Sequence, residues 1–221
     1  MIYFFADDHY NVHPGKVIFE HLPDDRKSGI RFFENDWTVL ESASWLNDCE
    51  LLILNLIGTT CNLPHPGPGA EKAVRQWCEK GGNILMLHGS SAAFWQWEWW
   101  RSIVGFRWVR PNDPDGVEHS THPNKPYRLT VSKTRHVLTK SLEEIELPAD
   151  EIYINMEQVC PAMILMETHI EEGTFPQCTE AVSPWGGKLV NFIPGHAPEV
   201  TSNPKLIRNV ETIIDYLLKG K

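Results

Sequence analysis

The sequence predicts an α/β protein with an open, mostly parallel sheet, helices on both faces of that sheet and a more β-rich insertion in the second half. Short apolar runs alternate with helical patterns, and several runs are too apolar for strands that face water on one side. Polar residues follow the runs abruptly, as at the carboxyl edge of a parallel sheet. The 221 residues, 42% of them hydrophobic, suffice for one core, so we expect a single domain over residues 1–221.

The N-terminal quarter predicts buried strands separated by an irregular segment. Residues 2–6 form a short apolar run, and a polar loop that contains His9 follows it. Residues 15–37 have little periodicity and predict an irregular excursion holding a short helix. Residues 39–41 predict a short strand, and the almost continuously apolar residues 49–57 predict a stronger, buried one.

The central region predicts one further buried strand between two helices. A loop rich in proline and glycine covers residues 58–69, and a helical pattern over residues 70–80 stops at Gly81-Gly82. An apolar run, too short for a helix, then ends at His88. The tryptophan-rich residues 92–104 predict the next helix.

The second half has a different texture. Residues 106–126 hold four prolines and two histidines, which indicates a long loop of the kind that often carries function. Further strands are predicted over residues 127–132, 150–155, 163–167 and 188–193. Asn203-Pro204 then begins a strongly amphipathic helix.

Composition excludes several classes of partner. The formal net charge of −9 and the pI near 5.5 argue against nucleic acids and anionic membranes, because both need a basic surface. No apolar run approaches membrane-spanning length, and the N-terminus lacks the basic region of a signal peptide. Five cysteines without paired spacing predict free thiols and a cytoplasmic protein.

Histidines mark the expected site. His88 ends a predicted strand, Gly89 allows a close backbone approach, and the hydroxyls of Ser90 and Ser91 could cap a helix. His196 also follows a predicted strand, so it should share one crevice with His88. Such groups could act as general acid and base, or could bind a divalent metal.

Several short motifs, in order from about residue 38 to the C-terminus, resemble the trehalose-utilisation (ThuA-like) family. These are Gly81-Gly82, Leu87-His88-Gly89-Ser90, Trp97 and Trp100 with Ile103-Val104-Gly105, His122-Pro123, Asp150-Glu151-Ile152-Tyr153, Trp185-Gly186-Gly187, Gly195-His196 and the helix from Asn203. The resemblance implies a flavodoxin-like sheet related to class I glutamine amidotransferases and a role in disaccharide or keto-sugar metabolism. The chain departs from the family in its irregular residues 10–37, where a typical member has a clear first helix, and in Gly89, where many relatives have serine or another small residue.

The residues and the resemblance together give a candidate site. We expect the catalytic residues to be His88, His196, Glu151 and Tyr153. We expect the substrate-binding residues to be His9, Ser90, His122 and Trp95. A divalent metal is the candidate cofactor, with His88, His196 and Glu151 as its ligands. The predicted ligand is a neutral, hydroxyl-rich sugar, and Trp95 is assigned either to a sugar-stacking wall or to a contact between subunits of a homo-oligomer.

An amidotransferase mechanism is not expected. Its cysteine nucleophile would stand at the turn after the strand, where this chain has His88, and Cys78 falls inside a predicted helix. The G-x-S-x-G motif of serine hydrolases is missing too. Three classes remain open: an enzyme acting on a sugar, a sugar-binding module without turnover, and an amidotransferase-like interaction subunit.

Overall fold

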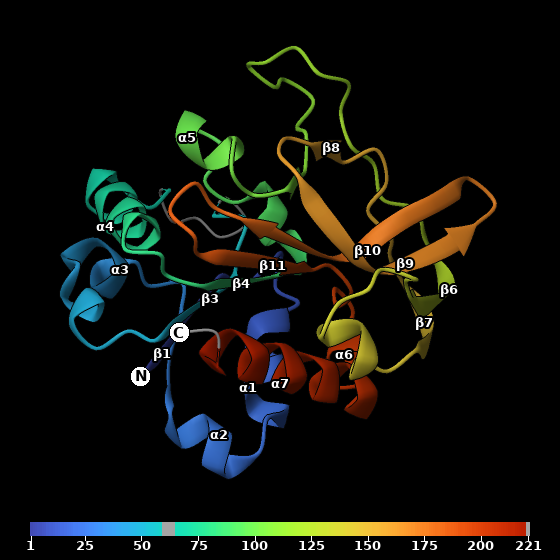
Figure 1. The fold of residues 1–221 in the computed structure, drawn as a ribbon, viewed down its shortest axis with the longest axis horizontal. Helices are drawn as coiled ribbons and strands as arrows, with labels where there is room; N and C mark the ends of the chain where they lie inside the picture. Colours follow the sequence, from blue (N-terminus) through green and yellow to red (C-terminus); the bar gives the residue numbers. More distant parts are fainter. Residues whose placement is uncertain (59–64, 220–221) are drawn as a thin grey trace.

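The computed structural model, which describes residues 1–58 and 65–219, has an α/β fold built on one open, nine-stranded sheet. The strand order is β2-β1-β3-β4-β11-β10-β9-β6-β7, and the first five of these strands are parallel to one another. The other four are antiparallel and form the β-rich second half, which extends the sheet to the right in Figure 1. The fold class predicted from the sequence is therefore confirmed.

The strands are β1 (Ile2–Ala6), β2 (Ile30–Glu34), β3 (Leu51–Asn55), β4 (Ile84–Leu87), β5 (Phe106–Arg107), β6 (Asn124–Val131), β7 (Ile145–Glu151), β8 (Glu157–Gln158), β9 (Ala162–Ile170), β10 (Gly173–Val182) and β11 (Lys188–Phe192). The α-helices are α1 (Pro14–His21), α2 (Asp24–Ser28), α3 (Thr38–Ser42), α4 (Pro68–Glu79), α5 (Glu98–Arg101), α6 (Pro198–Thr201) and α7 (Pro204–Lys219). Three short 3₁₀ helices are η1 (Ser44–Asn47), η2 (His88–Ala92) and η3 (Leu138–Lys140).

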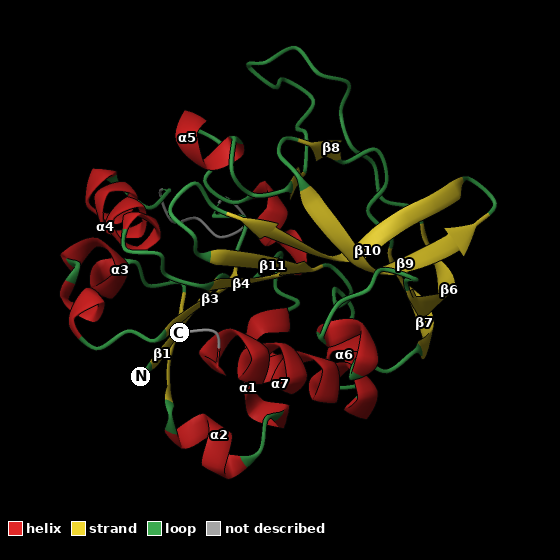
Figure 2. Ribbon diagram, viewed as in Figure 1, coloured by secondary structure: helices red, strands yellow, loops and turns green. Residues whose placement is uncertain are grey.

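The parallel strands β1, β3, β4 and β11 are buried on both faces because helices cover both. Alternate side chains of β1 enter different cores: Phe4 packs in the core that α7 completes, and Phe5 packs in the core that α4 completes. Figure 2 shows α1, α6 and α7 on one side of the sheet and α3 and α4 on the other. The nearly continuous apolar runs in the sequence follow from this double burial.

The register of the parallel strands fixes the position of the site. Ala6 at the end of β1 pairs with Asn55 at the end of β3, and Leu87 at the end of β4 pairs with Phe192 at the end of β11. These four strands therefore end at one edge of the sheet. The loops that leave this edge hold polar residues, among them His88. Residues far apart in the sequence are thereby brought together at the carboxyl edge.

Three local predictions were wrong. Residues 15–37 are not an irregular segment, since they contain α1, α2 and the edge strand β2. The β2 strand has only Ile30 fully buried, and it therefore lacks the continuous apolar run of a central strand. Residues 39–41 lie in the short helix α3 rather than in a strand, because Leu40 is the one buried residue of a single turn packed on α4.

Residues 92–104 do not form one helix. The backbone of Phe94 has a φ of 53°, which an α-helix cannot contain, and its ring stacks on Trp97 at a centroid distance of 4.0 Å. Helical structure resumes only in α5. The strand β10 and the helix α6 were not predicted at all. In residues 92–104, the packing of aromatic rings determines the backbone conformation, and helical periodicity does not.

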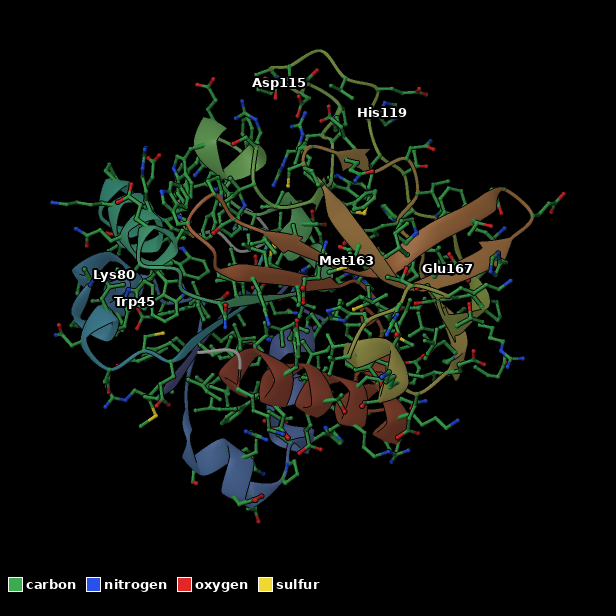
Figure 3. All side chains as sticks on the ribbon, viewed as in Figure 1. Trp45, Lys80, Asp115, His119, Met163 and Glu167 are labelled. Carbon is green, nitrogen blue, oxygen red and sulfur yellow. The ribbon has the colours of Figure 1, made fainter. Side chains whose placement is uncertain are left out.

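The remaining expectations concern thiols, membranes and the long loop. Cys49, Cys78, Cys160 and Cys178 are present as thiols rather than in disulfide bonds, and Cys61 lies outside the described residues. Within residues 1–58 and 65–219, no helix has both the length and the apolar character that crossing a membrane requires. The predicted long loop lies between β5 and β6, and Figure 3 labels Asp115 and His119 on it.

Candidate functional site

His88 is the buried centre of the site. It follows β4 directly, its φ is 45°, and its side chain is fully buried. Nδ1 lies 2.8 Å from the carbonyl oxygen of Ile193, which can only accept, so Nδ1 carries the proton and donates it. Nε2 faces the Tyr153 hydroxyl at 3.2 Å and Glu151 Oε2 at 3.4 Å. The ring is thus held in one orientation.

Two further histidines complete a cluster with His88. His9 comes from the loop after β1, and His196 comes from the loop after β11. The ring centroids lie 4.8 Å apart for His9 and His88, 5.3 Å for His88 and His196, and 5.2 Å for His9 and His196. One ring nitrogen from each residue lies within 4.8 Å of the other two. We call these three residues the histidine cluster.

Asp150 holds the loop that carries His196. Its fully buried carboxylate accepts backbone N–H groups from Gly195, His196 and Ala197, at distances of 2.9 to 3.1 Å for the shortest contact with each. Gly195 has a φ of 123°, a conformation that glycine adopts without strain. Asp150 belongs to one of the family-like sequence motifs, but that motif alone does not indicate its role. The structure makes it a positioning residue.

Asp7 plays the corresponding part near His9. Its Oδ2 atom accepts the backbone N–H groups of Ile57 and Gly58, both at 2.8 Å. Its Oδ1 atom has no hydrogen-bond partner and lies 3.6 Å from His9 Nδ1. Asp7 and His9 are both buried, so this carboxylate faces the histidine away from bulk solvent. Asp7 was predicted only as part of a polar loop.

Gly89 allows His9 to approach the backbone. A Cβ at this position would lie 2.5 Å from His9 Cε1 and 2.7 Å from Ile57 Cγ1. Such contacts are too short for any side chain, so a serine here would displace the His9 ring. The observed placement of the His9 ring therefore requires glycine at position 89.

Glu151 joins the histidine cluster to the open side of the site. Oε2 lies 3.4 Å from His88 Nε2 and 3.7 Å from His196 Nδ1, while Oε1 lies 3.4 Å from His122 Nδ1. The side chain of Glu151 is 16% exposed and that of His122 is 48% exposed. One carboxylate thus faces three imidazoles, of which one is accessible to solvent.

A cavity of about 360 Å³ opens above these groups. Its walls include His9, Tyr10, Trp108, Arg110, His122, Glu151 and Tyr153. Trp108 packs on Tyr153 with a centroid distance of 4.5 Å, and neither Trp108 nor Arg110 was singled out in the sequence. Only spatial proximity to Tyr153 identifies Trp108, since nothing in its local sequence distinguishes it from the other tryptophans. The volume falls within the range of pockets for small molecules.

Arg110 is the one cation among the residues that line this cavity. Its guanidinium lies over the Trp95 ring at 5.3 Å, and Nη2 donates to the Ala92 carbonyl oxygen at 3.1 Å. The Nε atom is buried without a hydrogen-bond partner, and burial lowers the pKa of the guanidinium. No sequence pattern indicates this role, because a single arginine in a long loop has nothing to distinguish it. Arg110 offers donors to an acceptor oxygen of a ligand.

Two predicted binding residues lie outside the cavity lining. Ser90 is buried, and its hydroxyl accepts the backbone N–H of Leu56 at 3.0 Å, so it links two strand ends. Trp95 lies behind Arg110 and donates from Nε1 to His65 Nε2 at 3.4 Å. The structure brings together the other six predicted residues: His9, His88, His122, Glu151, Tyr153 and His196.

Burial and charge together set the protonation of these groups. Burial alone would raise the pKa of Glu151, but His88, His196 and His122 outweigh it and lower that pKa to about 2. For His88 burial acts downward, yet Glu151 and Asp150 raise its pKa. Burial lowers the pKa of His9 and of His196, and it raises the pKa of Tyr153 well above its usual value. Glu151 is therefore ionised at neutral pH, and Tyr153 keeps its proton.

Comparison of the sequence with known proteins identifies the family to which the chain belongs. A family model described as ThuA, trehalose utilisation, matches residues 4–217. The chain belongs to the ThuA family. The resemblance noted in the sequence motifs is thereby confirmed, and the family connects the chain with sugars. Among curated proteins, none matches the sequence.

Solved structures agree with this assignment. A putative ThuA-like protein from Parabacteroides merdae has a TM-score of 0.75 at 14% identity, and the match covers 100% of this chain and 90% of that one. A putative ThuA-like protein from Bacteroides uniformis has a TM-score of 0.68 at 14% identity, covering 98% of this chain and 89% of that one. At this level of identity the likeness establishes the shared fold.

The glutaminase domain of Trypanosoma brucei CTPS, solved with bound acivicin, has the same fold. Its TM-score is 0.56 at 12% identity, with 100% of this chain and 94% of that chain covered. In the ThuA-family chain the turn after β4 carries His88, and the nearest described cysteine in sequence, Cys78, is buried in α4. Burial, with a contribution from Glu79, raises the pKa of the Cys78 thiol to about 12, which suppresses the thiolate.

Proposed function

We propose that this ThuA-family protein is an enzyme of sugar utilisation that transfers a proton on a neutral, hydroxyl-rich sugar derivative such as a keto-sugar. The observation that carries the proposal is Glu151, whose carboxylate lies within 3.4 Å of both His88 Nε2 and His122 Nδ1 at the floor of the cavity. A carboxylate that orients a solvent-accessible imidazole is a recurrent arrangement for general acid and base catalysis.

The cavity lining supports a sugar ligand. Tyr10 and Trp108 offer aromatic faces, while Arg110 and His122 offer polar groups. Such a mixture of aromatic walls and a few directed polar groups is typical of small-molecule sites. Arg110 Nε lacks a partner within the described protein and can donate to a hydroxyl or carbonyl oxygen. The family's connection with trehalose utilisation agrees with this class of ligand.

Each group has a distinct part in the proposed reaction. His122, oriented by Glu151, takes or returns the proton at the open side of the cavity. Positive charge beneath the cavity on His88, whose pKa Glu151 and Asp150 raise despite its burial, stabilises negative charge that develops on the sugar oxygen. Tyr153 lines the cavity, and when His88 is protonated its Nε2–H donates to the Tyr153 hydroxyl, whose own proton is then available to the same sugar oxygen. Isomerase, lyase and hydrolase chemistry all begin with such a proton transfer.

Deuterium exchange tests the proposal. The purified protein would be incubated in D₂O with a 3-keto-glycoside, trehalose or glucose, and the sugar followed by NMR. We expect exchange or turnover of the keto-sugar, reduced by about 10²-fold in Glu151→Gln, the usual scale for loss of an acid or base system. His169→Gln, at an exposed position on β9, serves as the matched control and should leave the rate unchanged.

Two results would contradict the proposal. Saturable sugar binding without exchange or product would support the sugar-binding module. Equal rates in wild type and Glu151→Gln would remove the carboxylate from the mechanism.

A further inference from the structure

We infer that the histidine cluster, His9, His88 and His196, is a binding site for a divalent transition-metal ion with imidazole ligands. The set differs from the one expected from the sequence, because His9 takes the place of Glu151. The inference deepens the proposed function: the ion would supply the positive charge beneath the cavity, and its catalytic part rests on that proposal. Metal binding itself can be measured independently.

The geometry favours one shared ion. One nitrogen of each ring lies within 4.8 Å of the other two, and the rings come from loops after β1, β4 and β11. Nitrogen ligands bond Zn²⁺ at about 2.0–2.1 Å, which places tetrahedral ligand atoms roughly 3.4 Å apart. Side-chain movements of about an ångström therefore suffice to close the site. The backbone need not rearrange.

Groups behind the rings orient them as in metal sites. His88 Nδ1 donates to the Ile193 carbonyl oxygen at 2.8 Å, so Nε2 is the ring nitrogen that would coordinate an ion, in place of its contacts with the Tyr153 hydroxyl and Glu151. His9 Nδ1 faces Asp7 Oδ1 at 3.6 Å. Metal-bound histidines characteristically donate their second ring nitrogen to a carbonyl or carboxylate oxygen in this way.

Unpartnered buried atoms give a second, independent observation. His9 Nδ1, His196 Nδ1 and Asp7 Oδ1 are all buried without a hydrogen-bond partner. Polar atoms in folded proteins are rarely left so, and such clusters commonly mark a missing ion or water. An ion that draws the three imidazoles together would fix their orientation and direct His9 Nδ1–H toward Asp7.

The charges around the cluster favour a cation. The carboxylates of Asp7, Asp150 and Glu151 surround it, and all three side chains are buried or nearly so. Arg110, the cation of the cavity lining, does not form an ion pair with any of them among the described contacts. A buried excess of negative charge is stabilised by a bound positive ion.

The ligand atoms select the class of metal. Three imidazoles suit Zn²⁺, Co²⁺, Ni²⁺ and Fe²⁺, whereas Ca²⁺ and Mg²⁺ prefer oxygen ligands. Three protein ligands leave a fourth position for water or a substrate oxygen. His9 lines the cavity, so that position would be open to a sugar. An ion there would polarise the bound oxygen.

Metal binding would be tested on protein purified without chelator. Elemental analysis measures the resident metal, and calorimetric titration with Zn²⁺ measures the affinity after dialysis against chelator. The visible absorption spectrum of the Co²⁺ form reports its coordination. We expect one ion per chain and a tetrahedral Co²⁺ spectrum. His9→Gln and His196→Gln should each weaken Zn²⁺ binding at least tenfold, while His169→Gln keeps the wild-type affinity.

Glu151→Gln separates the two candidate ligand sets. It should retain Zn²⁺ within a few fold if the histidine cluster is the site. Circular dichroism would confirm that each variant is folded, and the partly exposed His196 offers the variant most tolerant of change. Absence of stoichiometric binding to the folded wild type, or unchanged affinity in both histidine variants, would overturn the inference.

Failure of the metal site and failure of the proposed enzymatic function would give different results. Keto-sugar turnover that persists in chelator-treated, metal-free protein would overturn the metal site's role and leave the proposed function standing. Stoichiometric Zn²⁺ lost in the histidine variants, without any action on sugars, would support the metal site and contradict the proposed function.

Discussion

Tyr153 donates no charge to the site, yet its hydroxyl lies 3.2 Å from His88 Nε2 and lines the cavity. In the proposed mechanism it is the group through which the buried His88 would act on a bound ligand. Its ring is fully buried and packs on Trp108, so the hydroxyl has a fixed position. Burial, followed by the nearby Glu151, raises the pKa of this phenol well above its usual value. The hydroxyl stays protonated and can only be a neutral hydrogen-bonding group at neutral pH.

Tyr153→Phe should lower kcat on a keto-sugar by about 10–100-fold, because one directed hydrogen bond in the transition state is lost. KM should change much less, since the aromatic ring and its packing on Trp108 remain. Steady-state kinetics would measure the split between the two constants. A rise in KM with unchanged kcat would show that the hydroxyl only binds the ground state.

Asp150→Asn should destabilise the fold and release the loop that carries His196. The carboxylate accepts N–H groups from three consecutive residues, beginning at Gly195, and an amide nitrogen in its place would oppose a donor with a donor. We expect the free energy of unfolding to fall by about 2–3 kcal/mol in urea denaturation. Glu146→Gln, at an exposed position, is the control and should stay within about 0.5 kcal/mol of wild type. Equal stability of both variants would remove the anchoring role of Asp150.

Gly89→Ala should displace His9 from the histidine cluster. The new Cβ would stand 2.5 Å from His9 Cε1, and overpacking of this kind typically costs about 1–3 kcal/mol. The chemical shifts of the His9 ring protons would report the displacement. Gly116→Ala is an informative comparison because a Cβ there meets no atom within 4 Å, although its φ of 70° adds backbone strain. Unchanged His9 shifts in Gly89→Ala would contradict the close packing.

The buried ion pair of Arg107 and Asp113 should make stability depend on acid pH. Burial alone would raise the pKa of Asp113, but the Arg107 guanidinium, at 2.6 Å, outweighs it and holds that pKa below its usual value. A lowered folded-state pKa gives stability that is complete above the unfolded value, about 3.9, and is lost as pH falls through the folded value. Asp113→Asn should therefore be less stable than wild type at pH 7, and the difference should shrink below about pH 4. A difference that is constant with pH, measured by urea denaturation, would exclude this linkage.

Cys78 and Cys178 should resist alkylation in the native protein at pH 8. Both are buried, and burial raises the pKa of each thiol, for Cys78 to about 12. Only about one Cys78 in 10⁴ would be ionised at that pH, and the thiolate is the species that reacts. Mass spectrometry after iodoacetamide treatment would locate any label. Rapid labelling of Cys78 in folded protein, with loss of sugar turnover, would restore a thiol mechanism.

The sequence by itself determined the central strands and the last helix. The runs that became β1, β3, β4 and β11 are buried on both faces, and an unbroken apolar segment records that burial directly. Strand ends were also readable, because a polar residue follows the apolar run directly after β1 and β4 and within a few residues after β11. His88 and His196 were identified in this way, and the family motifs added Glu151 and Tyr153.

Only the tertiary structure decided which strand lies at the edge of the sheet and which residues make up the site. The edge strand β2 is recognisable by its pairing with β1 rather than by its own pattern. His9 joins the cluster because β1 ends level with β3, a matter of register between strands that local sequence does not encode. The roles of Asp7, Asp150 and Arg110 depend on which backbone groups and rings the folded chain places beside them. Periodicity reports whether a side chain is buried, whereas the partner of a buried charge is fixed by contacts between segments distant in the chain.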